Sequence, residues 1–513
     1  MDTSPLPIDP VLPELLRTVA GSPNTVLMAP PGAGKTTRVP LALLDLPELA
    51  GGRIVMLEPR RLAAFNAANR MAATIGEQAG ETVGYAMRFE RRVSRTTRIE
   101  VVTEGILTRR LQRDPCLEGV SLVIFDEFHE RNLTADLALA FCLEAQRLVR
   151  PDLKILVMSA TLQCGPVATL LGNAPVVVSE GRSYLVEIRW LEESGHQPLP
   201  ARMAGAVRQA LAETAGDILA FLPGAGEIRA CHDLLRDTLM GTATAIHPLY
   251  GDLPFAEQQQ AILPGPHRKV VLATNIAETS LTIEGVRVVV DSGLSRTLRH
   301  DSGTGMNRLL TVREARSSAE QRAGRAGRLG PGTCYRLYGR HTFNAMTAFP
   351  LPEILTADLT SLVLELAVWG VRDPADLAWL DPPPEAAVAA ARELLRDLGA
   401  LDRDGRVSAT GKRMAELPVH PRIARMLLRG EELGIAETAA TIGALLAERD
   451  IFRYGPGETA GRCDCDILER CGALAERGQR DPRIQAGPVR AVRRTASQLA
   501  RLMEASATAL PQS

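Results

Sequence analysis

The sequence predicts an α/β protein with two tandem α/β domains followed by a helical C-terminal part. Short apolar runs alternate with helix-length segments from Thr25 to about residue 179, and a second such series begins after Gly181. Beyond about Leu351 no further series of this kind appears. Continuous apolar runs separated by helix-length segments are typical of parallel strands that helices cover on both faces.

Five apolar runs in each series predict the strands. The first series consists of Thr25–Ala29, Ile54–Glu58, Ile99–Thr103, Leu122–Phe125 and Ile155–Met158. The second consists of Ile218–Leu222, Thr244–Tyr250, Val270–Thr274, Val286–Asp291 and Thr333–Leu337. After them, Ala357–Val368 and Glu385–Leu398 are predicted helices, residues 399–408 a small hairpin around an Asp-Gly turn, and the chain from Pro421 onward helical.

Composition excludes several classes of protein. The 513 residues suggest about three to five domains. The net charge of −1 gives no overall basic character, so any nucleic-acid-binding surface must be local. We find no signal peptide and no apolar run long enough for a membrane span. Eight scattered cysteines predict a reducing, cytoplasmic location, and the cluster Cys463, Cys465 and Cys471 lacks a fourth ligand for zinc.

The first functional motif, Ala29-Pro-Pro-Gly-Ala-Gly-Lys-Thr36, lies between a predicted strand and a predicted helix. That context favours a P-loop, in which backbone N–H groups and the helix N-terminus bind a polyphosphate. The first position departs from the usual pattern, because Ala29 replaces a glycine. The alternative is a glycine-rich turn without a ligand. The predicted ATP-binding residues here are Pro31, Gly32, Ala33, Gly34, Lys35, Thr36 and Thr37, with the Thr36 hydroxyl on Mg²⁺.

The second motif, Asp126-Glu-Phe-His129, follows the apolar run 122–125. Two carboxylates at the carboxyl end of a parallel strand lie where open α/β sheets place their chemistry. One can hold Mg²⁺ and the other can orient the attacking water. The alternative is that the two acids only cap the next helix. A P-loop earlier in the chain favours the role at Mg²⁺ and water over this alternative.

The third motif, Gln321-Arg-Ala-Gly-Arg-Ala-Gly-Arg328, carries arginines three residues apart along one side of a helical turn. A solvated basic face is the structural alternative. Its glycines each cost about 1 kcal/mol in a helix interior, so the segment is a poor scaffold. We therefore expect these arginines to deliver charge to a phosphate.

With these motifs, the sequence resembles superfamily 2 helicases of the DEAH/RHA type. Within this family it is most similar to the bacterial HrpB-type ATP-dependent helicases, whose second motif also has Phe in the third place. Five further segments resemble family motifs in the family's order: Glu58–Leu62, Thr103–Leu107, Ser159–Thr161, Phe221–Gly224 and Ala273–Thr282.

The resemblance implies a role for each matching residue. Lys35 and Thr36 would bind phosphate and Mg²⁺, Asp126 and Glu127 would lie at the metal, and Glu127 would be the catalytic base. Gln321, Arg325 and Arg328 would act on the γ-phosphate, and Arg70 would stack on the base, with Leu263 where an aromatic ring is expected. Ser159 and Thr161 would couple nucleotide state to domain closure. The nucleic-acid contacts would be Arg60, Arg88, Thr103, Gly105, Thr274 and Asn275.

The resemblance also implies the domain plan and the function. It predicts two RecA-like P-loop domains over 11–180 and 181–350, a winged-helix domain over 351–417 and an α-helical ratchet domain over 418–513. Residues 296–316 would form the family's long hairpin, or else a plain exposed one. The expected activity is ATP-dependent helicase translocation, 3′→5′ on single-stranded RNA or DNA, by a monomer without membrane contact. The alternative is an ATP-gated RNA-binding or complex-remodelling switch that does not unwind.

Overall fold

The computed structural model describes residues 5–88, 90–160, 164–180, 184–191, 197–251, 253–278, 283–301, 304–453, 465–475 and 481–508. The chain divides into two compact units, each treated separately below. The first contains Met1–Ala357 and Leu377–Pro382, and the second contains Asp358–Asp376 and Pro383–Ser513.

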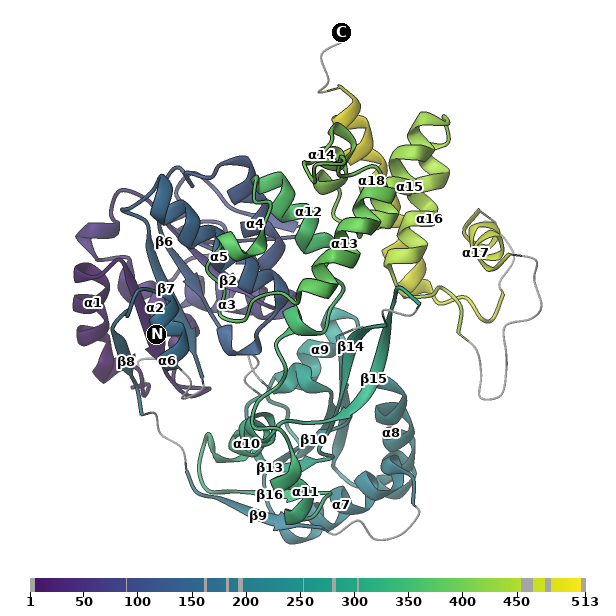
Figure 1. Cartoon of the computed structure of the whole chain (residues 1–513). Coiled ribbons are helices and arrows are strands. Elements are labelled where there is room, and N and C mark those ends of the chain that lie inside the picture. Colours follow the sequence, from purple (N-terminus) through teal and green to yellow (C-terminus); the bar gives the residue numbers. More distant parts are fainter. Residues whose placement is uncertain are drawn as a thin grey trace. The chain divides into compact units, whose positions relative to one another are not determined.

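The first unit begins with an eight-stranded sheet in the order β4-β3-β5-β2-β6-β7-β1-β8, parallel except for the β3–β4 pair (Figure 1). The strands are β1 (Asn24–Met28), β2 (Arg53–Glu58), β3 (Val83–Met87), β4 (Glu90–Arg92), β5 (Ile99–Thr103), β6 (Val120–Phe125), β7 (Lys154–Ser159) and β8 (Val176–Val178). The helices are α1 (Leu12–Gly21), α2 (Lys35–Leu43), α3 (Arg61–Thr74), α4 (Glu104–Arg113), α5 (Leu133–Leu148) and α6 (Cys164–Leu170). The central strands are almost wholly buried, as apolar runs covered on both faces should be.

A second sheet, of six parallel strands, follows in the order β11-β12-β10-β13-β16-β9. Its strands are β9 (Val186–Trp190), β10 (Asp217–Phe221), β11 (Ala245–Leu249), β12 (Lys269–Ala273), β13 (Val286–Asp291) and β16 (Gly332–Arg336). The helices of this region are α7 (Leu199–Glu213), α8 (Ala225–Leu239), α9 (Phe255–Ile262), α10 (Arg316–Gly324) and α11 (Arg340–Ala345).

Between β13 and α10 the chain forms a long antiparallel hairpin, β14 (Leu294–Asp301) and β15 (Met306–Arg313), drawn as a twisted ribbon in Figure 1. Its register runs from Leu294 opposite Arg313 to Asp301 opposite Met306. The β15 side chains are almost all exposed. The described residues therefore contain a hairpin where the sequence predicts one over 296–316, with its two strands at 294–301 and 306–313.

The second unit is helical, with α12 (Thr360–Trp369), α13 (Glu385–Asp397), α14 (Ala409–Glu416), α15 (Pro421–Glu432), α16 (Ala436–Ala447), α17 (Asp466–Ala475) and α18 (Ala486–Thr508). The α12 helix begins three residues later than predicted, with Leu359 as its N-cap. The Asp358 carboxylate just before it accepts the Thr360 N–H at 2.8 Å, which satisfies one backbone donor of the first turn. The predicted hairpin at 399–408 is reduced to one bridge between Leu401 and Val407.

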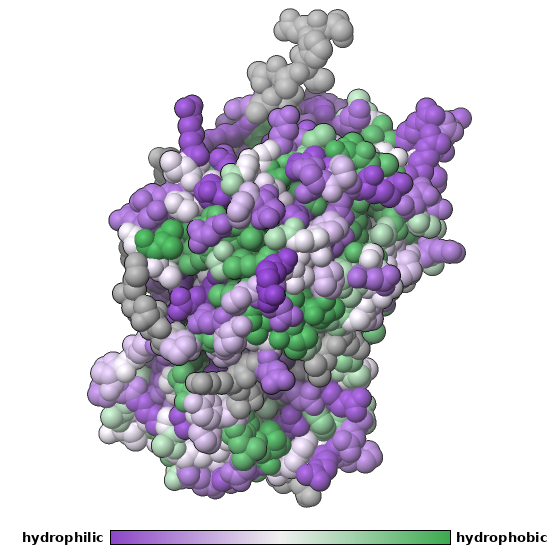
Figure 2. All heavy atoms as spheres, turned by 90° about the vertical axis from the view of Figure 1, so that its left-hand side faces the viewer, coloured by the Kyte–Doolittle hydropathy of each residue, from purple (hydrophilic) through white to green (hydrophobic). Residues whose placement is uncertain are grey.

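The predicted α/β class and its tandem architecture are confirmed, and every predicted strand run overlaps an observed strand. The edge strands β4, β8 and β9 were missed, and so was the internal strand β3, whose apolar run is interrupted by Gly84. No helix among the described residues is long and apolar enough to cross a bilayer. Figure 2 shows apolar residues lying among hydrophilic ones on the face drawn, as is ordinary for a globular surface.

Candidate nucleotide and nucleic-acid site

The predicted P-loop connects β1 to the N-terminus of α2 and needs glycine at two positions. Gly32 and Gly34 have φ of +84° and +97°, in the left-handed region that side chains rarely occupy. A Cβ on Gly34 would also lie 2.7 Å from the Leu6 Cδ1 atom. The loop rests on the N-terminal segment, because the Ile8 N–H donates to the Ala33 carbonyl at 3.0 Å.

The polar side chains of this loop meet the predicted acids at the end of β6. The Lys35 Nζ atom lies 2.7 Å from Oε1 of Glu127, and both side chains are at least 96% buried. The Thr36 hydroxyl donates to Oδ2 of Asp126 at 2.5 Å. The structure thus brings together four residues from positions about ninety apart in sequence. Glu127 has φ +49°, so the backbone is held in an uncommon conformation at the predicted base.

The electrostatics of this cluster separate the two acids. Burial raises the pKa of Asp126. Burial also acts to raise the pKa of Glu127, but the neighbouring cationic groups, Lys35 foremost, together outweigh burial and lower that pKa to about 2. Glu127 is therefore ionised at neutral pH. Its Oε2 atom is buried and accepts no hydrogen bond from the described residues, so the carboxylate retains one oxygen for a further donor.

Glu58 and His129 complete the surroundings of the acids, and neither was predicted as a site residue. Burial raises the pKa of Glu58, at the end of β2, well above its usual value, and the neighbouring Asp126 and Glu127 raise it further. His129 Nδ1 lies 3.4 Å from Glu127 Oε2, but it accepts the Ala160 N–H, and burial lowers the pKa of this histidine. His129 is therefore neutral, and no ion pair joins it to Glu127.

The predicted coupling residues of the segment 159–161 are only partly described. Ser159 is buried at the end of β7. Thr161 lies outside the described residues. The contact between Ala160 and His129 links this segment to the acids.

The arginine motif divides into two kinds of residue. Arg325 and Arg328 extend to the nucleotide cluster: a Cβ on Gly32 would lie 3.4 Å from Nε of Arg328, and Glu127 lies near both guanidinium groups. Burial lowers the pKa of both, to about 10 for Arg328. Two neighbouring desolvated cations favour an anionic ligand. Gln321, on α10, is partly buried.

Arg322 corrects the expectation that all three arginines deliver charge to phosphate. It is 1% exposed and contacts the carboxylates of Glu278, Asp291 and Glu314. Its positive charge is therefore balanced by carboxylates inside the second α/β region.

Three of the predicted nucleic-acid contacts lie close together. Arg60, at the N-cap of α3, donates to the Asn275 carbonyl at 3.1 Å and to Oε2 of Glu130 at 3.2 Å. Thr274 immediately precedes Asn275 at the end of β12. The hydrogen bond between Arg60 and Asn275 therefore joins the predicted nucleic-acid segments of the two α/β regions.

The other predicted contacts lie on separate elements. Thr103 is the N-cap of α4, and Gly105 is exposed in its first turn, with open space where a Cβ would be. Arg88 follows β3 and is partly buried.

The predicted base-stacking residues are exposed. Arg70 lies on α3, and Leu263, which follows α9, is 58% exposed. The role of Arg70 at the base of the nucleotide therefore stays a prediction.

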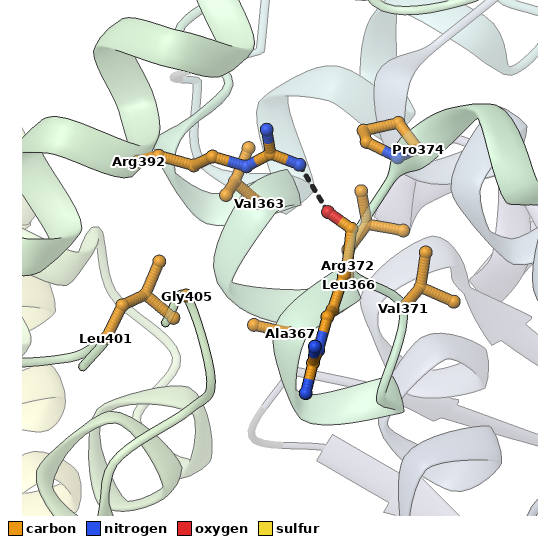
Figure 3. A pocket seen from close by; sticks show the side chains of 9 residues that line it. All are labelled: Val363, Leu366, Ala367, Val371, Arg372, Pro374, Arg392, Leu401 and Gly405. Atoms are coloured by element: carbon orange, nitrogen blue, oxygen red, sulfur yellow. Dashed lines mark hydrogen bonds between the residues drawn. The ribbon is translucent and has the colours of Figure 1, made fainter. Parts of the chain in front are cut away.

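The second unit contains a small pocket between α12, α13 and the 401–405 turn (Figure 3). Val363, Leu366 and Leu401 contribute apolar surface, and Arg392 donates to the Arg372 carbonyl beside them. None of the predicted site residues lines it.

Three family models match successive segments of the chain. The family model described as DEAD/DEAH box helicase matches residues 10–170, and the helicase conserved C-terminal domain matches residues 204–330. The winged-helix part of the helicase associated domain (HA2) matches residues 391–419.

Two curated relatives show the degree of similarity. The ATP-dependent RNA helicase HrpB of Escherichia coli (strain K12) is 50% identical over 87% of this chain and 55% of its own length. The pre-mRNA-splicing factor ATP-dependent RNA helicase prp22 of Schizosaccharomyces pombe is 37% identical over 87% of this chain and 39% of its own length. The chain thus spans about half or less of the length of these relatives.

Two solved structures match as well. A crystal structure of the Escherichia coli DEAH/RHA helicase HrpB has a TM-score of 0.86 at 46% identity, covering 97% of this chain and 60% of that one. A second, of the E. coli DExH-box NTPase HrpB, has a TM-score of 0.84 at 46% identity, covering 98% and 59%.

Proposed function

Since this chain belongs to the HrpB-like DEAH/RHA helicases, we propose that it is an ATP-dependent RNA helicase that uses the P-loop cluster to hydrolyse ATP. The observation that carries the proposal is the convergence of Lys35, Glu127 and the guanidinium groups of Arg325 and Arg328. A helicase needs such a cluster to convert phosphate chemistry into motion.

The residues at this cluster fit Mg²⁺. Asp126 and Thr36 supply the carboxylate and hydroxyl oxygens that this cation prefers, and they already lie 2.5 Å apart. Glu127 would lie next to the ion. When bound, the cation would neutralise charge on the phosphates.

We assign the chemical roles as follows. The ionised Glu127 takes the proton of the attacking water on its unpaired Oε2 atom. Arg325 and Arg328 stabilise the charge that develops on the transferred phosphoryl group, with Gln321 nearby. Residues 31–37 hold the phosphates through backbone N–H groups and Lys35, and Arg70 stacks on the base.

The nucleic-acid strand would be held through its backbone by Arg60, Arg88, Thr103, Gly105, Thr274 and Asn275. The Arg60–Asn275 hydrogen bond supports this role, because it brings together one residue from each α/β region that could contact the same strand. We propose 3′→5′ translocation with Ser159 and Thr161 coupling it to the nucleotide. Backbone contacts predict little sequence preference.

We also propose the boundaries 11–180, 181–350, 351–417 and 418–513 for the four domains. We further propose a monomeric protein in the cytoplasm, and the free thiols of the seven cysteines described fit a reducing compartment.

The test is steady-state ATP hydrolysis with single-stranded RNA and DNA added in parallel, followed by strand separation from a 3′-tailed duplex. Glu127→Gln is the matched control, because the amide keeps the shape but takes no proton. We expect stimulated hydrolysis and unwinding in the wild type and neither in the variant. Stimulated hydrolysis without unwinding would favour the switch, and hydrolysis by Glu127→Gln at the wild-type rate would refute the assigned base.

A further inference from the structure

Among the described residues of the second α/β region, Arg322 is the most completely buried basic residue. Its guanidinium group lies 4.9 Å from the Phe221 ring centroid, and only 1% of its side chain is exposed. Its pKa is raised, because the surrounding carboxylates outweigh the effect of burial. Such a cation is stable only while its partners keep their positions.

Each partner of Arg322 comes from a different segment. Nε donates to the Glu278 carboxylate at 3.0 Å, and Nη1 donates to the Asp291 carboxylate at 2.9 Å. Nη2 donates to Glu314. Glu278 is the last described residue of the segment after β12. Asp291 ends β13, and Glu314 directly follows β15.

The Glu314 contact and a further hydrogen bond from Arg322 to the Leu294 carbonyl hold the base of the β14–β15 hairpin. Glu314 lies at its exit, and its N–H donates to the Gly293 carbonyl at 3.0 Å. At the entrance, Arg322 Nη1 also donates to the Leu294 carbonyl at 3.2 Å. Both ends of the hairpin are thus bound to one guanidinium group.

The contact with Glu278 connects Arg322 to Arg325 of the nucleotide cluster. While the Glu278 carboxylate binds Arg322, the Glu278 carbonyl accepts the Arg325 Nε–H at 2.8 Å. Glu278 is 7% exposed, and burial raises its pKa to about 7. Arg325 therefore takes its orientation from a backbone group whose own side chain is held by Arg322.

We propose that Arg322 is a positioning residue that couples the orientation of Arg325 to the base of the β14–β15 hairpin. Movement of the hairpin against a bound strand is transmitted through Glu314 and Arg322 to Glu278, and from there to Arg325. This inference rests on the proposed function, because Arg325 must act on phosphate and the hairpin must meet the nucleic acid.

Glu314→Gln tests the coupling with little change of shape. The amide removes the charge that binds the hairpin exit and leaves the contact of Arg322 with Glu278. We expect hydrolysis without RNA to stay within about twofold of the wild type, and its stimulation by single-stranded RNA to fall about fivefold or more. Glu320→Gln, an exposed carboxylate on α10, is the matched control and should behave as the wild type.

Arg322→Lys provides a second variant. One ammonium group keeps the charge but cannot reach three carboxylates in fixed directions. We expect kcat to fall about tenfold or more with KM for ATP nearly unchanged, since Arg325 loses its orientation while the P-loop is intact.

The outcomes separate the inference from the proposed function. A wild type without RNA-stimulated hydrolysis refutes the function, and the coupling with it. A stimulated wild type with an equally stimulated Glu314→Gln variant refutes the coupling alone. If basal and stimulated rates fall by one factor together with the melting temperature, Arg322 and Glu314 serve only the fold.

Discussion

Arg322 and Arg325 lie three residues apart in one motif, yet their partners give them different uses. Arg322 is bound by three carboxylates inside the second α/β region. Arg325 donates Nε to a backbone carbonyl, and its guanidinium group lies near Glu127. Helical spacing placed the two on one side of a turn, but only the fold shows which carboxylates surround each.

At the residue scale, Arg325→Ala is expected to lower ATP turnover about 10³-fold, because it removes a cation from the phosphoryl-transfer site. Nucleotide binding should be largely retained, since Lys35 and the P-loop backbone are unchanged. Steady-state kcat and equilibrium binding of a fluorescent ATP analogue check both parts. Turnover near the wild-type value would remove Arg325 from the site.

A pH-dependent prediction concerns Glu104, whose Oε1 accepts the Asn132 side-chain N–H at 2.9 Å. Burial raises the pKa of this carboxyl from 4.5 to about 8. A raised pKa means that the folded state holds the proton more tightly than the unfolded state. The stabilisation is complete below about pH 4.5 and is lost as the pH rises towards 8.

Glu104→Gln should abolish that loss, because an amide accepts the same hydrogen bond and does not ionise. The variant should melt about 3 °C or more above the wild type at pH 8.5, with a smaller difference at pH 5. Glu118→Gln, at an exposed position, is the control. An identical melting difference at both pH values would show that Glu104 is ionised throughout.

At the scale of elements, the segment before α1 supports the P-loop from behind. Ile8 is fully buried, and its Cγ2 atom lies 3.2 Å from the position of a Cβ on Gly34. The loop conformation therefore depends on side chains that precede β1.

Ile8→Ala should lower the free energy of unfolding by about 2–5 kcal/mol and leave a cavity under the loop. We expect KM for ATP to rise severalfold. Ile228→Ala, equally buried in the core of the second sheet, is the matched control and should destabilise without changing KM. Chemical denaturation and steady-state kinetics measure the two effects. Equal KM values in both variants would contradict the supporting role.

The elements that the sequence predicted are those with a strong periodic signal. The central strands, such as β6 and β7, are continuous apolar runs, and the glycines of the P-loop and the acids after β6 follow motif spacing. Edge strand β8 has only three residues, so its pattern is too short to recognise. Glu58 and His129 were missed as neighbours of the acids, because their positions depend on how β2 and the segment after β6 meet.

At the scale of the whole molecule, a net charge of −1 means that nucleic-acid affinity depends on a few local cations. Arg60 and Arg88 are the cationic members of the predicted contact set. With two phosphate contacts and a slope of about −0.7 per contact, affinity for single-stranded RNA should fall about sevenfold between 50 and 200 mM salt.

Fluorescence anisotropy across that salt range gives the slope directly. Arg60→Gln should reduce it by about 0.7, since one contact is lost. A fall of several hundredfold in the wild type would mean that many more cations touch the strand than these two.

The buried ion pair of Lys35 and Glu127 has a consequence for turnover. The lysine that should hold a phosphate is bound by the carboxylate that should activate water. Under the proposed function, the phosphates of ATP would compete with Glu127 for Lys35, so that nucleotide binding would release the carboxylate for the attacking water. After cleavage the carboxylate would compete with the products for the same lysine, and re-forming the ion pair would help to expel ADP and phosphate.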